Sequence, residues 1–153
     1  MNLCILGVTG SIGVQTLDVV RKNKDFNILS VTCNTNISKL RAIIMEFTPS
    51  YVSIGRIQDV AELEREFPNV KFGYGSKGLV EAATYPSQDA VLVVNALVGS
   101  AGLEPTIYAI KAGRNVALAN KETLVVGGEI IKPLLEENNV SLIPIDSEHS
   151  AIF

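Results

Sequence analysis

The 153-residue sequence has no tryptophan, one histidine and two cysteines. It also lacks any run of the roughly 20 apolar residues that a membrane-spanning helix needs. Its 13 Lys and Arg against 16 Asp and Glu give a formal net charge of −3. That balance lacks the basic excess that is typical of a nucleic-acid-binding domain. The sequence therefore predicts neither a membrane nor a nucleic acid as a partner.

Both cysteines, Cys4 and Cys33, lie in apolar runs that are typical of buried strands. A free cysteine in such a run is most often a buried, reduced thiol, and a disulfide is unusual in a cytosolic protein. The first residues, MNLCILG, enter an apolar strand directly and resemble neither a secretory signal nor a transit peptide. We therefore expect reduced thiols and a cytoplasmic location.

Short apolar runs alternate with helical patterns along the whole chain, and 47% of the residues are hydrophobic. We expect strands at 3–6, 26–33, 51–54, 70–75, 90–97, 115–119 and 140–145. We expect helices at 11–22, 38–47, 59–67, 77–84, 103–113 and 122–139. Ser38 is the expected N-cap of the second helix, and Gly113 is the expected glycine at the end of the fifth.

Continuously apolar strands that are each followed by a helix indicate right-handed crossovers and a parallel sheet. A chain of this length suits one domain. The sequence therefore predicts a doubly wound α/β domain, with a mostly parallel, Rossmann-like sheet and helices on both faces. In such folds ligands bind beyond the carboxyl ends of the strands.

The first strand is followed by GVTGSIG, which places Gly7, Gly10 and Gly13 three residues apart at the start of a helix. A glycine turn there lets the backbone approach a pyrophosphate, whose charge then rests on the helix N-terminus. The GxxGxxG spacing is common among NADP-linked reductases. The alternatives are glycines that serve packing only, and hydroxyls of Thr9 and Ser11 that only cap the helix.

The stretch after the second strand, CNTN, contains no acidic residue. An NAD enzyme would place an Asp or Glu there against the ribose hydroxyls, and a carboxylate would repel a 2′-phosphate. The stretch therefore favours NADP, although no Lys or Arg lies within it. Hydrogen-bond donors are present at Asn34, Thr35, Asn36 and Ser38, and Lys39 follows in the next helix. An ordinary loop is the alternative.

The stretch ANKETLV follows the sixth strand. Glu122 suits the dipole of a helix start whatever its function, whereas a cation in that position is slightly unfavourable. We therefore expect Lys121 to have a functional role, at an edge of the sheet where phosphates would lie. The alternative is an ordinary solvated surface lysine. Asn120 is placed to bridge ribose or nicotinamide groups.

The stretch DSEHS follows the last strand and carries Asp146 and Glu148 two residues apart. On an extended segment both carboxylates lie on one face, and such oxygen donors suit Mg²⁺ or Mn²⁺. Solvated acids, or a capped helix start with an acidic first turn, explain the pair equally well. His149 is more typical of a capping or packing histidine than of a ligand. A third ligand would have to come from elsewhere.

Taken in order, the segments ILGVTGSIG, LVGSAGLEPT, ANKETLV and PIDSEHSAIF resemble the 1-deoxy-D-xylulose 5-phosphate reductoisomerase family. The likeness runs from the first strand to the last residue. The resemblance implies an enzyme that isomerises and then reduces 1-deoxy-D-xylulose 5-phosphate to 2-C-methyl-D-erythritol 4-phosphate, on the methylerythritol phosphate route to isoprenoids. It also implies NADPH and a divalent metal (Mn²⁺, Mg²⁺ or Co²⁺) as cofactors, and a bacterial cytoplasmic enzyme.

The resemblance further assigns a role to each motif residue. It implies that the cofactor is bound by Thr9, Gly10, Ser11 and Ile12 at the pyrophosphate, by Asn34, Thr35 and Asn36 at the adenosine ribose and its phosphate, and by Asn120 and Glu122 on the nicotinamide side. It implies that Lys121 and Ser147 contact the substrate, and that Asp146 and Glu148 bind the metal. Lys121, Ser147 and Glu148 are thus the expected catalytic residues.

Two departures from the family bear on these expectations. The family often has a basic residue where Thr35 stands, which leaves open how strongly this chain prefers NADPH to NADH. The family also continues well beyond SEHSAIF, with a further metal-binding glutamate, phosphate-binding groups and a lid. Residues 1–153 are thus the expected dinucleotide-binding domain, ending at the start of the metal and substrate motif.

Alone, such a domain would bind cofactor without activity, and the full-length protein is an expected homodimer. One alternative is a non-catalytic nucleotide-binding or sensing module, which would have no need of Lys121, Asp146 and Glu148. Another is a different NADP-linked reductase, which does not explain SEHSAIF.

Overall fold

The computed structural model describes residues 1–145, except for the side chain of Lys121. Seven strands lie in this range: β1 (Asn2–Leu6), β2 (Asn27–Thr32), β3 (Tyr51–Ile54), β4 (Lys71–Tyr74), β5 (Val91–Asn95), β6 (Asn115–Leu118) and β7 (Leu142–Pro144). The α-helices are α1 (Ser11–Lys22), α2 (Ile37–Phe47), α3 (Val60–Glu66), α4 (Gly75–Ala83), α5 (Leu103–Lys111) and α6 (Lys121–Asn138). Two short 3₁₀ segments, η1 (Ile57–Asp59) and η2 (Gly99–Gly102), precede α3 and α5.

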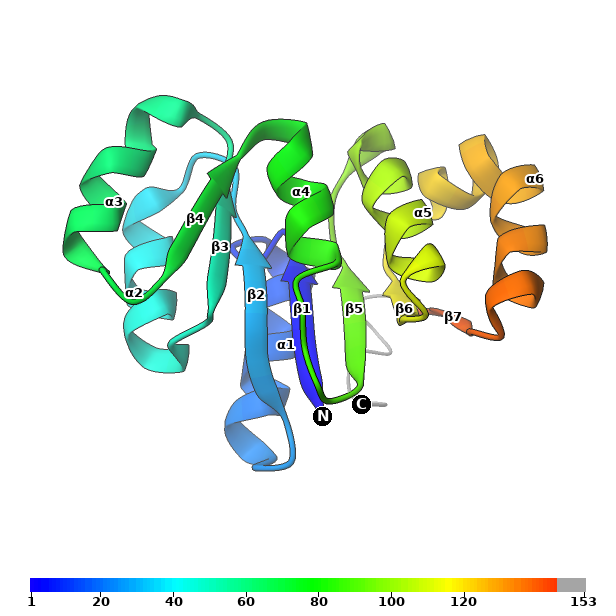
Figure 1. Ribbon diagram of the computed structural model, residues 1–153, viewed down its shortest axis with the longest axis horizontal. Coiled ribbons are helices and arrows are strands. Elements are labelled where there is room, and N and C mark those ends of the chain that lie inside the picture. Colours follow the sequence, from blue (N-terminus) through cyan, green and yellow to red (C-terminus); the bar gives the residue numbers. More distant parts are fainter. Residues whose placement is uncertain (146–153) are drawn as a thin grey trace.

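The strands form one seven-stranded sheet in the order β4-β3-β2-β1-β5-β6-β7, and every neighbouring pair is parallel (Figure 1). The chain starts in the middle of the sheet and winds outward to β4. It then returns to place β5 beside β1, and winds outward in the other direction to β7. This confirms the doubly wound fold, and it makes the gap between β1 and β5 the switch point, where ligands bind in such sheets.

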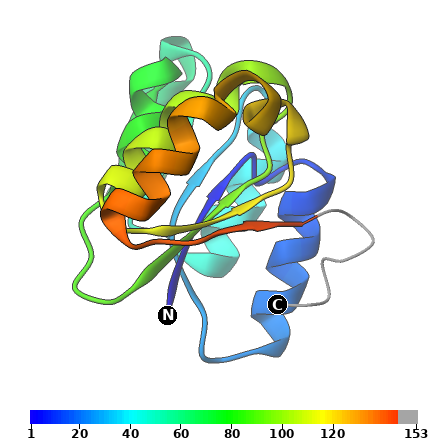
Figure 2. The same cartoon turned by 90° about the vertical axis from the view of Figure 1, so that its right-hand side faces the viewer.

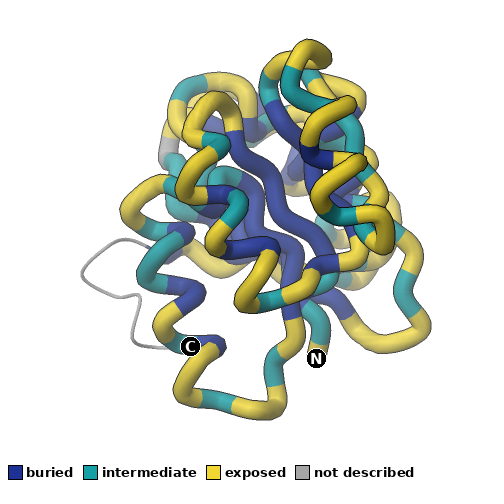
Figure 3. The backbone as a smooth tube through the Cα atoms, turned by 90° about the vertical axis from the view of Figure 1, so that its left-hand side faces the viewer, coloured by how far each residue is buried: buried dark blue, intermediate teal, exposed yellow. Residues whose placement is uncertain are grey.

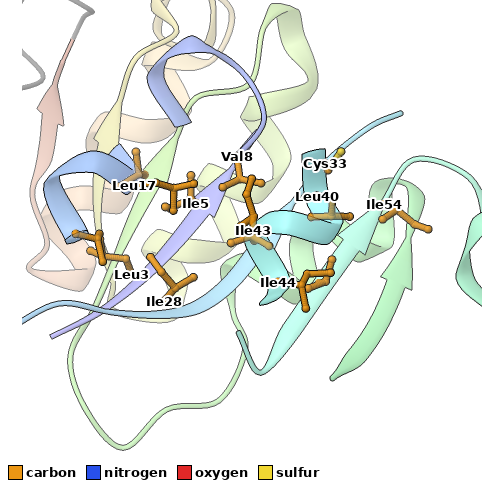
Figure 4. Packing of buried hydrophobic residues seen from close by; sticks show 14 of the residues in the cluster. Leu3, Ile5, Val8, Leu17, Ile28, Cys33, Leu40, Ile43, Ile44 and Ile54 are labelled. Carbon is orange, nitrogen blue, oxygen red and sulfur yellow. The ribbon is translucent and has the colours of Figure 1, made fainter. Parts of the chain in front are cut away.

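Helices cover both faces of the sheet, with α1 on one side and α5 and α6 on the other (Figure 2). Successive side chains of β1 belong to different layers. Leu3 and Ile5 belong to the core that includes residues of α1, α2 and α3, whereas Cys4 and Leu6 belong to the core that includes residues of α4, α5 and α6. This alternation follows from the two-residue period of a strand. Figure 4 shows the first of these cores, and in Figure 3 the central strands are buried while the outer helix faces are exposed.

The thiols of Cys4 and Cys33 are both free and buried, as the sequence predicted. Burial raises the pKa of Cys4 to about 12, so this thiol stays protonated at neutral pH. Along the described part of the chain, no helix combines the length and the apolar character that crossing a membrane requires.

The predicted bounds of α1 are confirmed, but the predicted N-cap of α2 is wrong. The cap is Asn36, whose side-chain oxygen accepts a hydrogen bond from the backbone N–H of Lys39 at 3.2 Å. Asn and Ser are equally good caps, and the helix begins one residue earlier than predicted, which leaves Ser38 inside the first turn. The expected helix 59–67 is α3, which begins at Val60 directly after the 3₁₀ segment η1, and the other predicted bounds that differ do so by one or two residues.

The prediction that Gly113 ends α5 is confirmed. Its φ is +78°, and the backbone N–H groups of Gly113 and Arg114 donate to the carbonyl oxygens of Ile110 and Ala109 at 2.9 and 3.0 Å. This pair of hydrogen bonds is the Schellman motif, which satisfies the last carbonyls of a helix.

Two other helices end on residues with positive φ that are not glycine: Thr48 after α2 and Asn139 after α6. Asn tolerates this left-handed conformation, whereas a β-branched residue is strained in it. Thr48→Asn should therefore raise the free energy of unfolding by about 0.5–1 kcal/mol, measured by urea denaturation. The reciprocal change Asn139→Thr, also at an exposed position, should lower it by a similar amount. Equal stability of all three proteins would contradict the assignment of strain to Thr48.

Candidate functional site

A cavity of about 400 Å³ opens at the carboxyl edge of the sheet, beside the switch point between β1 and β5. Its walls come from the carboxyl ends of four strands and the residues after them: Gly7, Thr9 and Gly10 after β1, residues 32–34 at the end of β2, 53–55 at the end of β3 and 96–98 after β5. Gly75 and Leu79 of α4 and Ala101 of η2 complete it. A larger hollow of about 890 Å³ lies elsewhere and is open, formed by residues of α6 alone. The first cavity is therefore the candidate site.

The three glycines of the turn differ in backbone conformation and in the space that a side chain would have. Gly7 has a φ of +81°, and a Cβ there would lie 3.1 Å from the carbonyl oxygen of Ala96. A Cβ on Gly13 would lie 2.5 Å from the carbonyl oxygen of Gly7 and 2.6 Å from that of Val8. For these two, conformation and packing suffice as an explanation, in line with the packing alternative.

Gly10 is not explained in that way. Its φ of −81° suits any residue, and a Cβ there would meet only the carbonyl oxygen of Gly7, at an ordinary 3.6 Å. Gly10 is exposed at the N-terminus of α1, beside the cavity. Its missing side chain therefore leaves room for a group from outside the chain.

The N-terminus of α1 has no side-chain cap and no acidic residue in its first turn. The predicted alternative, that Thr9 and Ser11 cap the helix, is wrong: Thr9 Oγ1 contacts Cys33 Sγ at 3.7 Å, and Ser11 Oγ accepts from Gln15 Nε2 at 3.3 Å. The first N–H groups of α1 thus lack a side-chain partner at the positive end of the helix dipole. That arrangement attracts an anion such as a phosphate.

Cys33 and Asn34, at the start of the loop after β2, form the next wall of the cavity, and Thr35 and Asn36 follow them outside its lining. Asn34, Thr35 and Asn36 are exposed, and Cys33 lies beneath them with its thiol against the carbonyl oxygen of Asn36 at 3.4 Å. Burial raises the pKa of the Cys33 thiol. The loop after β2 thus presents neutral amide and hydroxyl groups and no carboxylate.

Lys39 is brought to this site by the packing of α2 beside α1, which the sequence alone did not reveal. Its Nζ donates a hydrogen bond to the carbonyl oxygen of Thr9 in the glycine turn, at 3.0 Å. An ammonium group therefore lies against the glycine turn at Thr9, which is one of the residues that line the cavity.

Asn120 joins the start of α6 to the segment after β5. Its side-chain oxygen accepts from the N–H of Glu122 at 2.9 Å, and its Nδ2 donates to the carbonyl oxygen of Gly99. Glu122 is exposed. Both residues predicted on the nicotinamide side thus follow β6, two strands away from β1 on the β5 side of the switch point.

Asn95 is a structural support of the site that the sequence analysis missed. Its side chain is buried, donates to the carbonyl oxygen of Gly102 at 3.0 Å and to Thr106 Oγ1 at 2.7 Å, and accepts from the N–H of Leu97 at 3.2 Å. These bonds hold the segment that lines the cavity after β5. An Asn at the end of the apolar run AVLVVN was the available signal, because a buried polar group needs partners.

The residues predicted to bind metal and substrate are not among those described. Asp146, Ser147, Glu148 and His149 lie outside residues 1–145, and the side chain of Lys121 is not described either. The preceding Ile145 is buried and donates its N–H to the carbonyl oxygen of Leu118, at the carboxyl edge of the sheet. Within residues 1–145, no three His, Cys, Asp or Glu side chains are grouped so that they could hold a metal ion.

Comparison with known proteins shows the family of this chain. The family model of 1-deoxy-D-xylulose 5-phosphate reductoisomerase matches residues 3–128, which is most of the chain. The chain belongs to the 1-deoxy-D-xylulose 5-phosphate reductoisomerase family. A relative with that name from Listeria welshimeri is 50% identical over 152 residues, which cover 99% of this chain and 40% of the relative.

Solved structures of reductoisomerases share the fold closely. A crystal structure of a reductoisomerase with NADPH, fosmidomycin and magnesium is 36% identical, with a TM-score of 0.88 over 97% of this chain and 37% of the other. The Zymomonas mobilis reductoisomerase with NADPH is 34% identical, with a TM-score of 0.86 over 97% of this chain and 39% of the other. The chain thus spans about 40% of the length of the reductoisomerases that it matches.

Proposed function

We propose that this chain is the NADPH-binding domain, residues 1–153, of a reductoisomerase. The observation that carries the proposal is the N-terminus of α1 at Gly10. It has no side-chain cap, has open space where a side chain would be, and lies next to a cavity at the switch point of the sheet. Gly7 and Gly13 are explained by the chain's own conformation and contacts, whereas the space at Gly10 serves nothing within the described chain. A pyrophosphate fits that space in charge and in position.

The rest of the cofactor follows from the order of the strands. We assign the pyrophosphate to Thr9, Gly10, Ser11 and Ile12, and the adenosine ribose to Asn34, Thr35 and Asn36. The loop after β2 lies beside the glycine turn and has no carboxylate to repel a 2′-phosphate. Asn120 and Glu122 lie on the other side of β1, beyond β5, so we assign them to the nicotinamide side.

For the full-length protein we propose the conversion of 1-deoxy-D-xylulose 5-phosphate to 2-C-methyl-D-erythritol 4-phosphate. When bound, the divalent metal (Mn²⁺, Mg²⁺ or Co²⁺) supplies a Lewis acid and NADPH supplies the hydride. Lys121 and Ser147 would contact this phosphorylated sugar, and Asp146 and Glu148 would hold the metal. Two carboxylates leave the metal short of ligands, so the remainder of the protein must add others and the isolated domain should be inactive.

We further propose that the full-length protein is a cytoplasmic homodimer. The outer face of α6 supports a buried contact in the larger protein, because Val125, Val126 and Ile130 are 84%, 62% and 53% exposed. Sedimentation of the full-length protein tests this, and a monomer at high concentration would contradict it.

The alternative function is a non-catalytic nucleotide sensor. It gives no role to Lys121, Asp146 and Glu148, and a gene that ends at Phe153 would favour it.

Calorimetric titration of the chain with NADPH and NADH in parallel tests the cofactor site. We expect NADPH to bind at least about tenfold more tightly than NADH, because a charge-assisted contact to the 2′-phosphate is present only in NADPH. Equal affinities would keep the site but remove the preference. Binding of neither cofactor would contradict the proposal for this domain.

A further inference from the structure

We propose that Lys39 is the residue that binds the 2′-phosphate of NADPH and so sets the preference for NADPH over NADH. The inference rests on the proposed cofactor site. It supplies the cation that the loop Asn34–Asn36 lacks, since that loop contains no Lys or Arg.

The position of the ammonium group carries the inference. The backbone N–H of Lys39 is held by Asn36 in the first turn of α2, and its Nζ reaches the carbonyl oxygen of Thr9 at 3.0 Å. The side chain of Lys39 thus extends from the loop proposed for the ribose to the turn proposed for the pyrophosphate. In NADPH the 2′-phosphate is attached to the ribose that joins the pyrophosphate to adenine, so in the proposed site it would lie at the loop assigned to that ribose, where Lys39 reaches toward the glycine turn.

The charge of Lys39 is not neutralised within the described chain. Its side chain is exposed, and its hydrogen bond goes to an uncharged carbonyl oxygen rather than to a carboxylate. A cation in the first turn of a helix is also disfavoured by the positive end of the dipole. A doubly charged phosphate at this place would relieve that repulsion and provide the missing partner.

Two other cations near the cavity are less well placed. Arg56 follows β3 and Lys77 lies in α4 after β4, whereas Lys39 follows β2, the immediate neighbour of β1. Neighbouring strands lie about 4.8 Å apart, so Arg56 stands one strand further from the glycine turn and Lys77 two. The guanidinium of Arg56 is also paired with Asp59 at 3.3 Å.

Titration of Lys39→Gln with NADPH and NADH separates this role from a structural one. Glutamine keeps an N–H donor for the Thr9 carbonyl but removes the charge. We expect the affinity for NADPH to fall about tenfold and the affinity for NADH to change by less than about twofold. Lys39→Arg should retain most of the preference, and Arg56→Gln, the matched control, should leave the ratio of the two affinities unchanged.

The outcomes are distinct. An equal loss for both cofactors in Lys39→Gln would mean that the side chain only tethers α2 to the turn, and would overturn the inference. The inference would also be overturned if the ratio of the NADPH and NADH affinities changed with Arg56→Gln instead, or with neither variant. Either result would leave the proposed cofactor site unaffected. If the unsubstituted chain bound neither cofactor, the proposed function would fail together with this inference.

Discussion

Gly10→Asp is expected to weaken NADPH binding at least about 100-fold while making the fold more stable. The backbone of Gly10 already has an N-cap conformation, with φ −81° and ψ 177°, and a Cβ there meets no close neighbour. An aspartate would accept hydrogen bonds from the free N–H groups of α1 and would suit its dipole, for a gain of about 1 kcal/mol in the free energy of unfolding. The same carboxylate would occupy the proposed pyrophosphate position and repel its charge.

Calorimetry with NADPH and urea denaturation measure the two effects on the same protein. Gly10→Asn is the matched control, because asparagine caps a helix equally well but carries no charge. We expect it to be more stable than the unsubstituted protein but less stable than Gly10→Asp, because it lacks the charge that suits the dipole, and to bind NADPH more tightly than that variant. Unchanged NADPH affinity in Gly10→Asp would contradict the placement of the pyrophosphate at α1.

Gly13→Ala is expected to destabilise the protein by about 3 kcal/mol, because it overpacks a rigid site. In a helix, Ala is normally favoured over Gly by about 1 kcal/mol. Here the new Cβ would lie 2.5 Å from the carbonyl oxygen of Gly7 and 2.7 Å from the carbonyl carbon of Val8. These are backbone atoms of the glycine turn and cannot rotate away, so α1 and the turn would have to separate.

Gly128→Ala is the matched control, because Gly128 is also helical, and a Cβ there would meet nothing within 4 Å. We expect this change to raise the free energy of unfolding by about 0.5–1 kcal/mol. Urea denaturation of both variants should thus show effects of opposite sign. A stabilising Gly13→Ala would contradict the close contact between α1 and the turn.

The order and type of the elements could be predicted from the sequence, because both depend on local pattern. Continuous apolar runs separated by helical periodicity led to seven strands and six helices, and the bounds of α1 agree with the structure. The parallel winding followed from the alternation alone. Where two residues were equally suited to a local role, as Asn36 and Ser38 were to capping α2, the pattern was not decisive.

What each glycine of the turn does was decided only by the tertiary structure. In the sequence Gly7, Gly10 and Gly13 are equivalent members of one motif, but Gly7 depends on the backbone of Ala96, 89 positions away along the chain, and Gly10 on nothing nearby. Lys39 reaches Thr9 for the same kind of reason, because α2 packs beside α1. The period of a sequence determines which face a side chain occupies. Contacts between distant segments arise only when those faces pack together, and here they determine where a phosphate can bind.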